Sequence, residues 1–416
     1  MNFSANRMQN KSSFNYAEVQ PKDESNSIMR KICVVTGTRA EYGLLSRLMR
    51  MIKDSQMTQL QVIATNMHLS PRFGNTYTEI EKDGFTINYK VPIIDEESSN
   101  DSISTVLEMS RGLKGYAEAY RDLKPDMLLI LGDRYEMLAA ATAALIMRIP
   151  IAHISGGAIS EGAFDDAIRH SITKMSQLHF TEAEDYRRRV IQLGEQPDRV
   201  FHVGALGVEN IKKLPLMNKE EIEADIKFKI DKKTILVTYH PVTLGNHTVE
   251  QDITEFMNAL SQRPDIRVVF TMPNSDTGSQ AIVDAINGFV TKNQERSVAY
   301  KSLGALRYLS VMKEVGAVVG NSSSGLVEVP SFGIPTLNIG DRQKGRLAAD
   351  SVLNCNTDSK SILAGLDRVL SPEFIGIASR TQNPYDKKGT AQAIFDVISS
   401  YPIEHLKQKN FYDIKQ

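Results

Sequence analysis

Residues 32–43 read Ile-Cys-Val-Val-Thr-Gly-Thr-Arg-Ala-Glu-Tyr-Gly, a short β-branched run that turns at a glycine into a longer stretch. Similar runs, separated by stretches with helical periodicity, predict strands over residues 32–36, 60–65, 85–91, 127–132, 149–154 and 200–203. Alternating strands and helices are typical of a parallel sheet, and strands that are apolar throughout are typical of a sheet covered on both faces. We therefore expect a Rossmann-like domain over residues 29–205.

The pattern starts again after a linker rich in Lys and Pro, which begins Ile211-Lys-Lys-Leu-Pro-Leu. The second set of predicted strands covers residues 234–238, 267–271, 317–320 and 336–339. These strands predict a second doubly wound α/β domain over residues 206–385, and a chain of 416 residues is indeed too long for one core. The last predicted helix, near residues 389–400, follows the completed second sheet. We therefore expect residues 386–416 to pack back on the first domain.

The composition excludes several classes of protein. The 49 Lys+Arg against 50 Asp+Glu give a net charge of −1, which disfavours nucleic-acid wrapping and polybasic adhesion to membranes. The most apolar stretch, residues 138–147, is far shorter than the roughly 20 residues that cross a bilayer, so we expect a buried helix there. Cys33 and Cys355 do not suit a disulfide framework or a cysteine metal site, and a cytoplasmic location fits best. Residues 1–28 are polar and are expected to be a disordered tail.

Residues that follow predicted strands are the candidates for a site, because ligands of doubly wound domains bind beyond the carboxyl ends of the strands. After the first strand, Gly37 would let the backbone approach an anion, and Arg39 could bind a phosphate or carboxylate, although a solvated arginine is common there. After a later strand, Asp133 and Arg134 could act as a base and a cation, or Asp133 could simply cap the next helix.

The segment 153–170 concentrates acids and cations directly after a predicted strand. Helical spacing places Asp166 and His170 on one face, and Asp165 and Arg169 on another. The plain alternative is a solvated helix whose first-turn acids pair with later cations. Two acids, an arginine and a histidine so close to a strand end favour a functional role.

The second domain contributes further candidates. His240 ends its first strand and Asn274 follows the second, and either could be structural. A Ser/Gly-rich turn at residues 322–324 opens a predicted helix, where hydroxyls, backbone N–H groups and the helix dipole would suit a diphosphate. Glu328 could accept hydrogen bonds from ribose hydroxyls, and Arg342 could hold the phosphates from the other side.

The sequence predicts no cofactor. The eight histidines lack HExxH spacing or a comparable metal-ligand cluster, and a P-loop is absent. The turn after the first strand also lacks the GxGxxG fingerprint, which argues against NAD as a cosubstrate.

Taken in order, these segments resemble the UDP-N-acetylglucosamine 2-epimerase family, in particular its hydrolysing bacterial branch. The resemblance covers nearly the whole chain after Met29. It rests on the motifs Gly37-Thr-Arg-Ala-Glu-Tyr-Gly, Leu131-Gly-Asp-Arg-Tyr-Glu, Ile168-Arg-His-Ser-Ile-Thr-Lys-Met-Ser, Gly320-Asn-Ser-Ser-Ser-Gly-Leu-Val-Glu-Val-Pro-Ser and Asn338-Ile-Gly-Asp-Arg-Gln-Lys-Gly-Arg. It implies the GT-B fold, in which two Rossmann-like domains enclose the ligand cleft.

The resemblance also implies roles for individual residues. Asp133 and Asp165 match acidic catalytic positions. Family members often carry a glutamate where this chain has Ser155 or Ala158, so acid–base work is expected to rest on the two aspartates and Glu161. His240 is counted as catalytic too. The residues expected around the UDP-sugar are Arg39, Arg134, Arg169, His170, Asn274, Lys301, Ser322, Ser323, Glu328 and Arg342.

The implied reaction converts UDP-N-acetylglucosamine to N-acetylmannosamine and UDP for sialic acid biosynthesis, through elimination to 2-acetamidoglucal and rehydration. The alternatives are the same reaction on UDP-2,4-diacetamido-2,4,6-trideoxyglucose, a non-hydrolysing epimerase, a GT-B glycosyltransferase and a non-catalytic sugar-nucleotide sensor. We expect no nucleic-acid or membrane partner, and exposed helices in the first domain would suit a homodimer or homotetramer.

Overall fold

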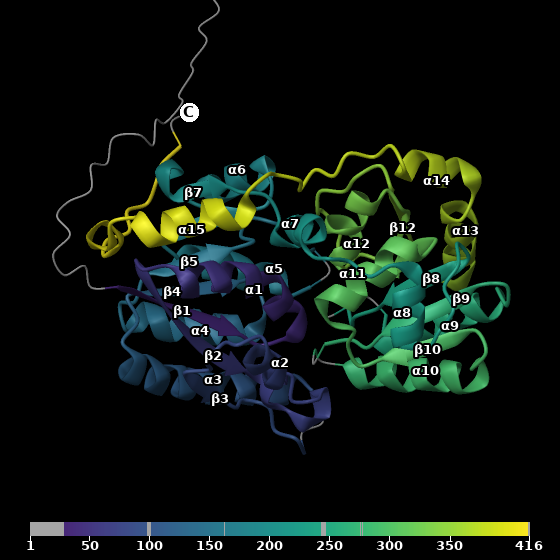
Figure 1. Cartoon of the computed structure of the whole chain (residues 1–416), viewed down its shortest axis with the longest axis horizontal. Helices are drawn as coiled ribbons and strands as arrows, with labels where there is room; N and C mark the ends of the chain where they lie inside the picture. Colours follow the sequence, from purple (N-terminus) through teal and green to yellow (C-terminus); the bar gives the residue numbers. More distant parts are fainter. Residues whose placement is uncertain are drawn as a thin grey trace, which may run out of the picture.

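The computed structural model describes residues 29–97, 101–161, 163–242, 247–274, 276 and 278–414, and it folds into two α/β domains (Figure 1). The expected tail at residues 1–28 lies outside the described residues. Each domain is built on a parallel sheet with helices on both faces. The fold class predicted from the sequence is thus confirmed.

The N-terminal domain has, within the described chain, a parallel sheet of seven strands in the order β3-β2-β1-β4-β5-β6-β7. The strands are β1 (Arg30–Thr36), β2 (Thr58–Thr65), β3 (Tyr89–Val91), β4 (Met127–Leu131), β5 (Ile151–Ile154), β6 (Leu178–Thr181) and β7 (Val200–His202). The helices are α1 (Arg39–Asp54), α2 (Tyr77–Lys82), α3 (Ser102–Leu123), α4 (Tyr135–Ile146), α5 (Asp165–Met175), α6 (Glu184–Gln192) and α7 (Leu206–Lys213). The strand order reverses between β1 and β4, so the crevice at the carboxyl ends of these two strands is a natural ligand site.

The side chains of β1 explain why its sequence is apolar throughout. Ile32 and Val34 pack in the core layer that contains α1, while Cys33 and Val35 pack in the layer that contains α3 and α4. All four side chains are fully buried. A strand covered on both faces cannot alternate apolar and polar residues, because the polar side chains would all point to one face and be buried there.

The C-terminal domain repeats this architecture, with six strands in the described chain in the order β10-β9-β8-β11-β12-β13. The strands are β8 (Thr234–Thr238), β9 (Arg267–Thr271), β10 (Ser297–Tyr300), β11 (Ala317–Gly320), β12 (Thr336–Ile339) and β13 (Val352–Cys355). The helices are α8 (Lys219–Ile226), α9 (Val249–Ser261), α10 (Ser279–Lys292), α11 (Gly304–Glu314), α12 (Ser324–Val327), α13 (Ser359–Val369) and α14 (Pro372–Ala378).

The last helix, α15 (Thr390–Ser400), lies on the N-terminal domain although it follows the C-terminal sheet in sequence (Figure 1). Its Ala391, Ile394 and Ile398 are fully buried in the same core layer as Ile32 and Val34 of β1. The chain therefore crosses between the domains twice.

The structure corrects several sequence-based expectations. A strand was expected over residues 85–91, but only Tyr89–Val91 is a strand, and β6, β10 and β13 were not expected. These three strands have four residues each and include polar residues, so they carry little pattern. The helix expected to be buried at residues 138–147 is exposed at its end, where the Ile146 side chain is 76% accessible. In the part of the chain described, no helix is long and apolar enough to span a membrane.

Candidate active site

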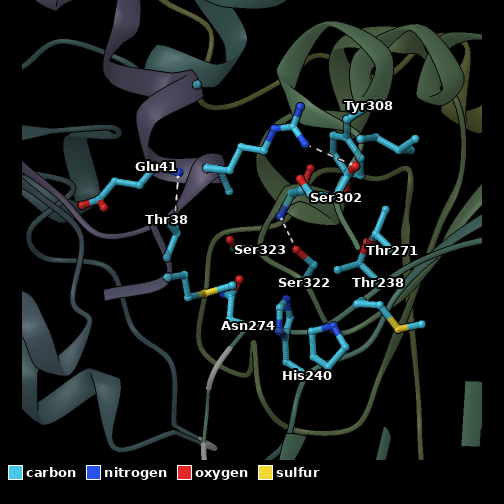
Figure 2. Close-up of a pocket in the computed structure, with 18 of the residues that line it drawn as sticks. Thr38, Glu41, Thr238, His240, Thr271, Asn274, Ser302, Tyr308, Ser322 and Ser323 are labelled. Atoms are coloured by element: carbon cyan, nitrogen blue, oxygen red, sulfur yellow. Dashed lines mark hydrogen bonds between the residues drawn. The ribbon is translucent and has the colours of Figure 1, made fainter. Parts of the chain in front are cut away.

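A cavity of about 650 Å³ lies between the two domains, and both domains line it. Its walls come largely from the segments that follow β1, β4, β8, β9, β10, β11 and β12, so the carboxyl ends of both sheets face it. Figure 2 shows Thr38 of the N-terminal domain on one side, and His240 and Ser322 of the C-terminal domain on the other. A cavity at this place in two doubly wound domains is the expected ligand site.

The turn after β1 is shaped by its own carboxylate. The Gly37 N–H donates to Glu41 Oε2 at 2.7 Å, and Thr38 Oγ1 caps α1 by accepting from the Glu41 N–H at 3.2 Å. A Cβ at Gly37 would lie 2.6 Å from Glu136 Oε1, so a larger residue would force a shift. The Gly37 N–H is thus already bonded to Glu41 within the turn, and the approach of the backbone to an anion that was expected at Gly37 stays a prediction. Burial, reinforced by the Glu136 charge, raises the pKa of Glu41 to about 8.

Arg39 and Arg134 line the cavity as expected, but both already have partners in the chain. Arg39 Nε lies 2.5 Å from a Glu79 carboxylate oxygen. Arg134 Nε lies 2.7 Å from Glu136, and its Nη1 lies 2.9 Å from Asp276 Oδ1 in the C-terminal domain. The Arg134–Asp276 ion pair therefore joins the two walls of the cleft, and neither arginine presents an unbalanced charge to a ligand.

Arg169 fixes Asp133 at the end of β4. Its side chain is only 2% exposed. Nη2 donates to a carboxylate oxygen of Asp133 and to Ser160 Oγ at 3.0 Å, while Nη1 donates to Asp166 Oδ1 at 3.1 Å and to a backbone carbonyl. The pairing of Arg169 with Asp165 that helical spacing suggested is not formed. Arg169 bonds to Asp166 one residue later, and Asp165 is left to face the cavity.

Asp133 and Asp165 have opposite pKa shifts, although both line the cavity. Burial would raise the pKa of Asp133, but the charges of Arg169 and Arg346 outweigh it and hold the pKa below its ordinary value. Burial and the nearby Asp133 charge raise the pKa of Asp165 to about 6. One carboxyl group is therefore held ionised, while the other can exchange a proton near neutral pH.

Three of the expected residues do not line the cavity: Glu161, Arg169 and His170. Glu161 is 54% exposed, and its carboxylate lies 3.7 Å from Lys344 Nζ. His170 Nε2 lies 3.5 Å from Asp166 Oδ2, which is the i,i+4 contact that the sequence spacing indicated. Because Glu161 and His170 do not line the cavity, we assign them no role in the reaction or in ligand binding.

A partly buried glutamate that the sequence pattern did not reveal, Glu182, lies next to the position where the family often has one. Ser155 Oγ donates to Glu182 Oε1 at 2.9 Å. Burial raises the pKa of Glu182, and the Arg346 charge opposes that rise. Glu182 directly follows β6, a strand that the pattern did not reveal, so its place at a strand end was not visible in the sequence. The chain thus places a carboxyl group beside Ser155 from the neighbouring strand.

Asn321 ties together three strand ends on the C-terminal wall. The His240 N–H donates to Asn321 Oδ1 at 2.7 Å, and Asn321 Nδ2 donates to the His240 carbonyl at 2.8 Å. The Asn321 carbonyl accepts from Arg342 Nη1 at 3.3 Å and from Gln343 Nε2 at 2.9 Å. Burial lowers the pKa of His240 to about 3, so its imidazole is neutral at physiological pH and can serve as a hydrogen-bond partner.

The helix expected to hold a diphosphate at its N-terminus is short. α12 has four residues before the 3₁₀ segment Val329–Phe332, so the hydroxyls of Ser322 and Ser323 are the main polar groups of this turn. Burial, together with the Glu182 charge, raises the pKa of Glu328 to about 8. All seven residues expected from the C-terminal domain line the cavity: His240, Asn274, Lys301, Ser322, Ser323, Glu328 and Arg342.

Comparison with known proteins gives the family. The sequence model described as UDP-N-acetylglucosamine 2-epimerase matches residues 50–399. The chain belongs to this family. The resemblance found in the motifs is confirmed, and the chain is accordingly a UDP-sugar 2-epimerase.

Among the described residues, no group of three or more His, Cys, Asp or Glu is arranged to hold a metal ion.

Two curated relatives and one solved structure illustrate the similarity. The GDP/UDP-N,N'-diacetylbacillosamine 2-epimerase (hydrolyzing) of Campylobacter jejuni is 42% identical over 345 residues, which are 83% of this chain and 88% of that protein. The polysialic acid biosynthesis protein P7 of Escherichia coli is 38% identical over 392 residues, 93% of this chain and 98% of that protein. The crystal structure of the Neisseria meningitidis UDP-GlcNAc 2-epimerase bound to UDP-GlcNAc has a TM-score of 0.73 at 18% identity, covers 88% of this chain and 99% of its own, and shares the fold.

Proposed function

We propose that this chain is a hydrolysing 2-epimerase, which converts a UDP-linked 2-acetamido sugar to the free C2 epimer and UDP. The observation that carries the proposal is the pair of carboxyl groups with opposite pKa shifts, Asp133 held ionised and Asp165 with a pKa of about 6. Both face the cavity whose opposite wall presents Ser322, Ser323 and Arg342. Acid–base groups on one side and diphosphate ligands on the other are what an elimination at C2 and C1 requires.

The proposed reaction is an elimination followed by hydration. Asp133 takes the C2 proton, the C–H electron pair forms the C1=C2 double bond, and the C1–O electron pair leaves with UDP. Asp165 then gives its proton to C2 from the opposite face, while water adds its oxygen to C1 and returns a proton to Asp165. Asp133 releases its proton to solvent. Since the C2–H is only weakly acidic, departure of the diphosphate drives the first step.

We place UDP-2,4-diacetamido-2,4,6-trideoxyglucose, which is UDP-N,N'-diacetylbacillosamine, first among the substrates. The support is the 42% identical relative, whose name gives that sugar. This reverses the order expected from the sequence, where UDP-N-acetylglucosamine came first. UDP-N-acetylglucosamine stays the second candidate, because the 38% identical relative is named for polysialic acid biosynthesis.

Incubation of the full chain with each UDP-sugar in deuterated water tests the proposal. We expect UDP and a free sugar that carries deuterium at C2 with inverted configuration, identified by NMR. Formation of the UDP-linked epimer alone would indicate the non-hydrolysing reaction. Turnover that needs an added acceptor would indicate a glycosyltransferase, and UDP binding with no product from either sugar would indicate a sensor.

A further inference from the structure

A cluster of buried charges lies outside the cleft, next to the C-terminal end of α5. Its centre is Glu195, whose side chain is only 3% exposed. The carboxylate lies 3.0 Å from His179 Nε2 and 2.7 Å from both Lys174 Nζ and Lys409 Nζ. Burial would raise the pKa of Glu195, but these three partners lower it to about 2. None of the four residues lines the cavity, so ligand binding does not explain the cluster.

Lys409 belongs to a segment at the end of the chain, residues 403–412, which we call the strap. The Arg199 guanidinium donates to two backbone carbonyls of the strap, at 2.7 Å and 3.1 Å. The Tyr412 N–H donates to the Gly194 carbonyl at 2.9 Å. Figure 1 shows this end of the chain, in yellow, beside the α6 region. The strap is therefore attached at several points to the segment that follows α6.

Lys409 caps the C-terminal end of α5. Its Nζ donates to three backbone carbonyls there, that of Thr173 at 3.1 Å and those of Lys174 and Ser176 at 2.6 Å each. The last carbonyls of a helix have no partners within the helix and form its negative end, so an ammonium is well placed beside them. The Lys409 side chain is only 19% exposed. A residue from the far end of the chain thus completes α5.

The opposite end of α5 carries the acid–base groups. Asp165 is the first residue of the helix, and Arg169, which holds Asp133, lies one turn further on. The helix begins after Phe164, whose side chain cannot cap it, so contacts further along have to fix its position. Its eleven residues span about 15 Å. Because a helix of this length moves as a rigid element, a shift at the capped end would displace the groups in the cleft.

We propose that Lys409 is a positioning residue for the reaction, and that the strap fixes α5 so that Asp165 and Arg169 keep their places in the cleft. The proposal rests on the function proposed above and goes beyond it, because no residue of the strap lines the cavity. A displacement of about 1 Å at a reacting group can slow a reaction by about 100-fold. A buried ion pair adds little stability compared with apolar packing, so a positional role accounts better for the buried charges.

Steady-state kinetics of the full chain with Lys409→Met test the proposal. We expect kcat to fall by about 10–100-fold while KM for the UDP-sugar stays within about twofold, because Ser322 and Ser323 lie in the other domain. Lys409→Arg keeps a cationic donor and should restore most of kcat. Lys407→Met removes an exposed charge from the same strap, so it is the matched control and should leave kcat unchanged.

Hydrogen exchange of the α5 amides, measured by mass spectrometry, gives a readout that does not depend on turnover. Exchange throughout α5 should be faster in Lys409→Met than in the wild type, and unchanged in Lys407→Met. Faster exchange confined to the last turn, with wild-type kcat, would overturn the proposal, because Lys409 would then act only as a local cap. So would a lower Tm with an unchanged kcat.

If Lys409→Met does not fold, Lys409→Gln replaces it, because glutamine keeps a hydrogen-bond donor without the charge. The same fall in kcat and the same faster exchange are then expected, and the absence of both would overturn the proposal. A wild-type chain that turns over neither sugar, but whose α5 exchanges faster when Lys409 is replaced, would refute the proposed function and leave the hold of the strap on α5 standing.

Discussion

Asp165→Asn should make the protein less active and more stable at the same time. Asparagine keeps the shape of the side chain but cannot exchange the proton that we assign to Asp165, so turnover should fall by about 10²–10⁴-fold. The same change removes a buried charge that lies near Asp133. Since the folded state disfavours that charge, its removal should stabilise the protein.

The size and the pH dependence of the gain follow from the pKa. Burial raises the pKa of Asp165 from its ordinary 3.8 to about 6. An acid with a raised pKa contributes stability that is fully present below pH 3.8 and is lost as the pH rises through 6. The ionised wild type therefore loses up to about 3 kcal/mol at pH 7 and roughly half as much at pH 5, and the asparagine variant avoids that loss.

Urea denaturation of both proteins at pH 5 and pH 7 measures this difference, with turnover followed in parallel by release of UDP. Asp166→Asn is the matched control, because it removes the negative charge that pairs with Arg169 and that accepts from the Ser160 N–H, and it should lower the urea midpoint. An Asp165→Asn variant that is no more stable than the wild type at pH 7, or equally more stable at both pH values, would refute the reasoning. Unchanged turnover would remove Asp165 from the mechanism.

Three other substitutions probe the site and its supports. Asp133→Asn should lower turnover by about 10²–10⁴-fold while calorimetry still detects UDP binding, and full activity would exclude Asp133 as the base. Tyr385→Phe removes the hydroxyl that donates to the Leu347 carbonyl, so the free energy of unfolding should fall by about 1–3 kcal/mol, and an unchanged urea midpoint would contradict this. Lys409→Met removes an ammonium that donates to three carbonyls at the end of α5 and pairs with a buried glutamate. It should lower the Tm, and a Tm equal to that of the wild type would show that this contact contributes nothing.

Most of the fold was predictable because most of the buried strands are apolar and are separated by stretches with helical periodicity. In the C-terminal domain, the four strands expected from the sequence agree with the observed bounds at residues 234–238, 267–271, 317–320 and 336–339. The strands that were missed include polar residues, and β6 contains His179, whose buried ring is hydrogen-bonded to Glu195 sixteen residues away. A contact of this kind leaves no periodic signal in the sequence.

The site was predictable in its location but not in its charges. Strand ends identified Asp133, Asp165, Ser322 and Ser323 because topology alone brings such residues to one edge. The sequence could not show that Arg39 and Arg134 are neutralised, since Glu79 and Asp276 lie far from them along the chain. Nor could it show which of two neighbouring aspartates pairs with Arg169, because that choice depends on where α5 begins.

The return of α15 to the first domain has a mechanical consequence. Two separate segments, one before α8 and one before α15, connect the domains. A pair of connections restricts relative motion to rotation about the line that joins them, whereas a single linker would also allow twisting. The same arrangement means that the N-terminal lobe is built from two separate pieces of the chain, whereas the C-terminal lobe is one continuous piece. A fragment that ends at residue 385 would leave part of one face of the first sheet uncovered, because α15 shares that face with α1. Opening of the cleft and completion of the fold therefore depend on the same last helix.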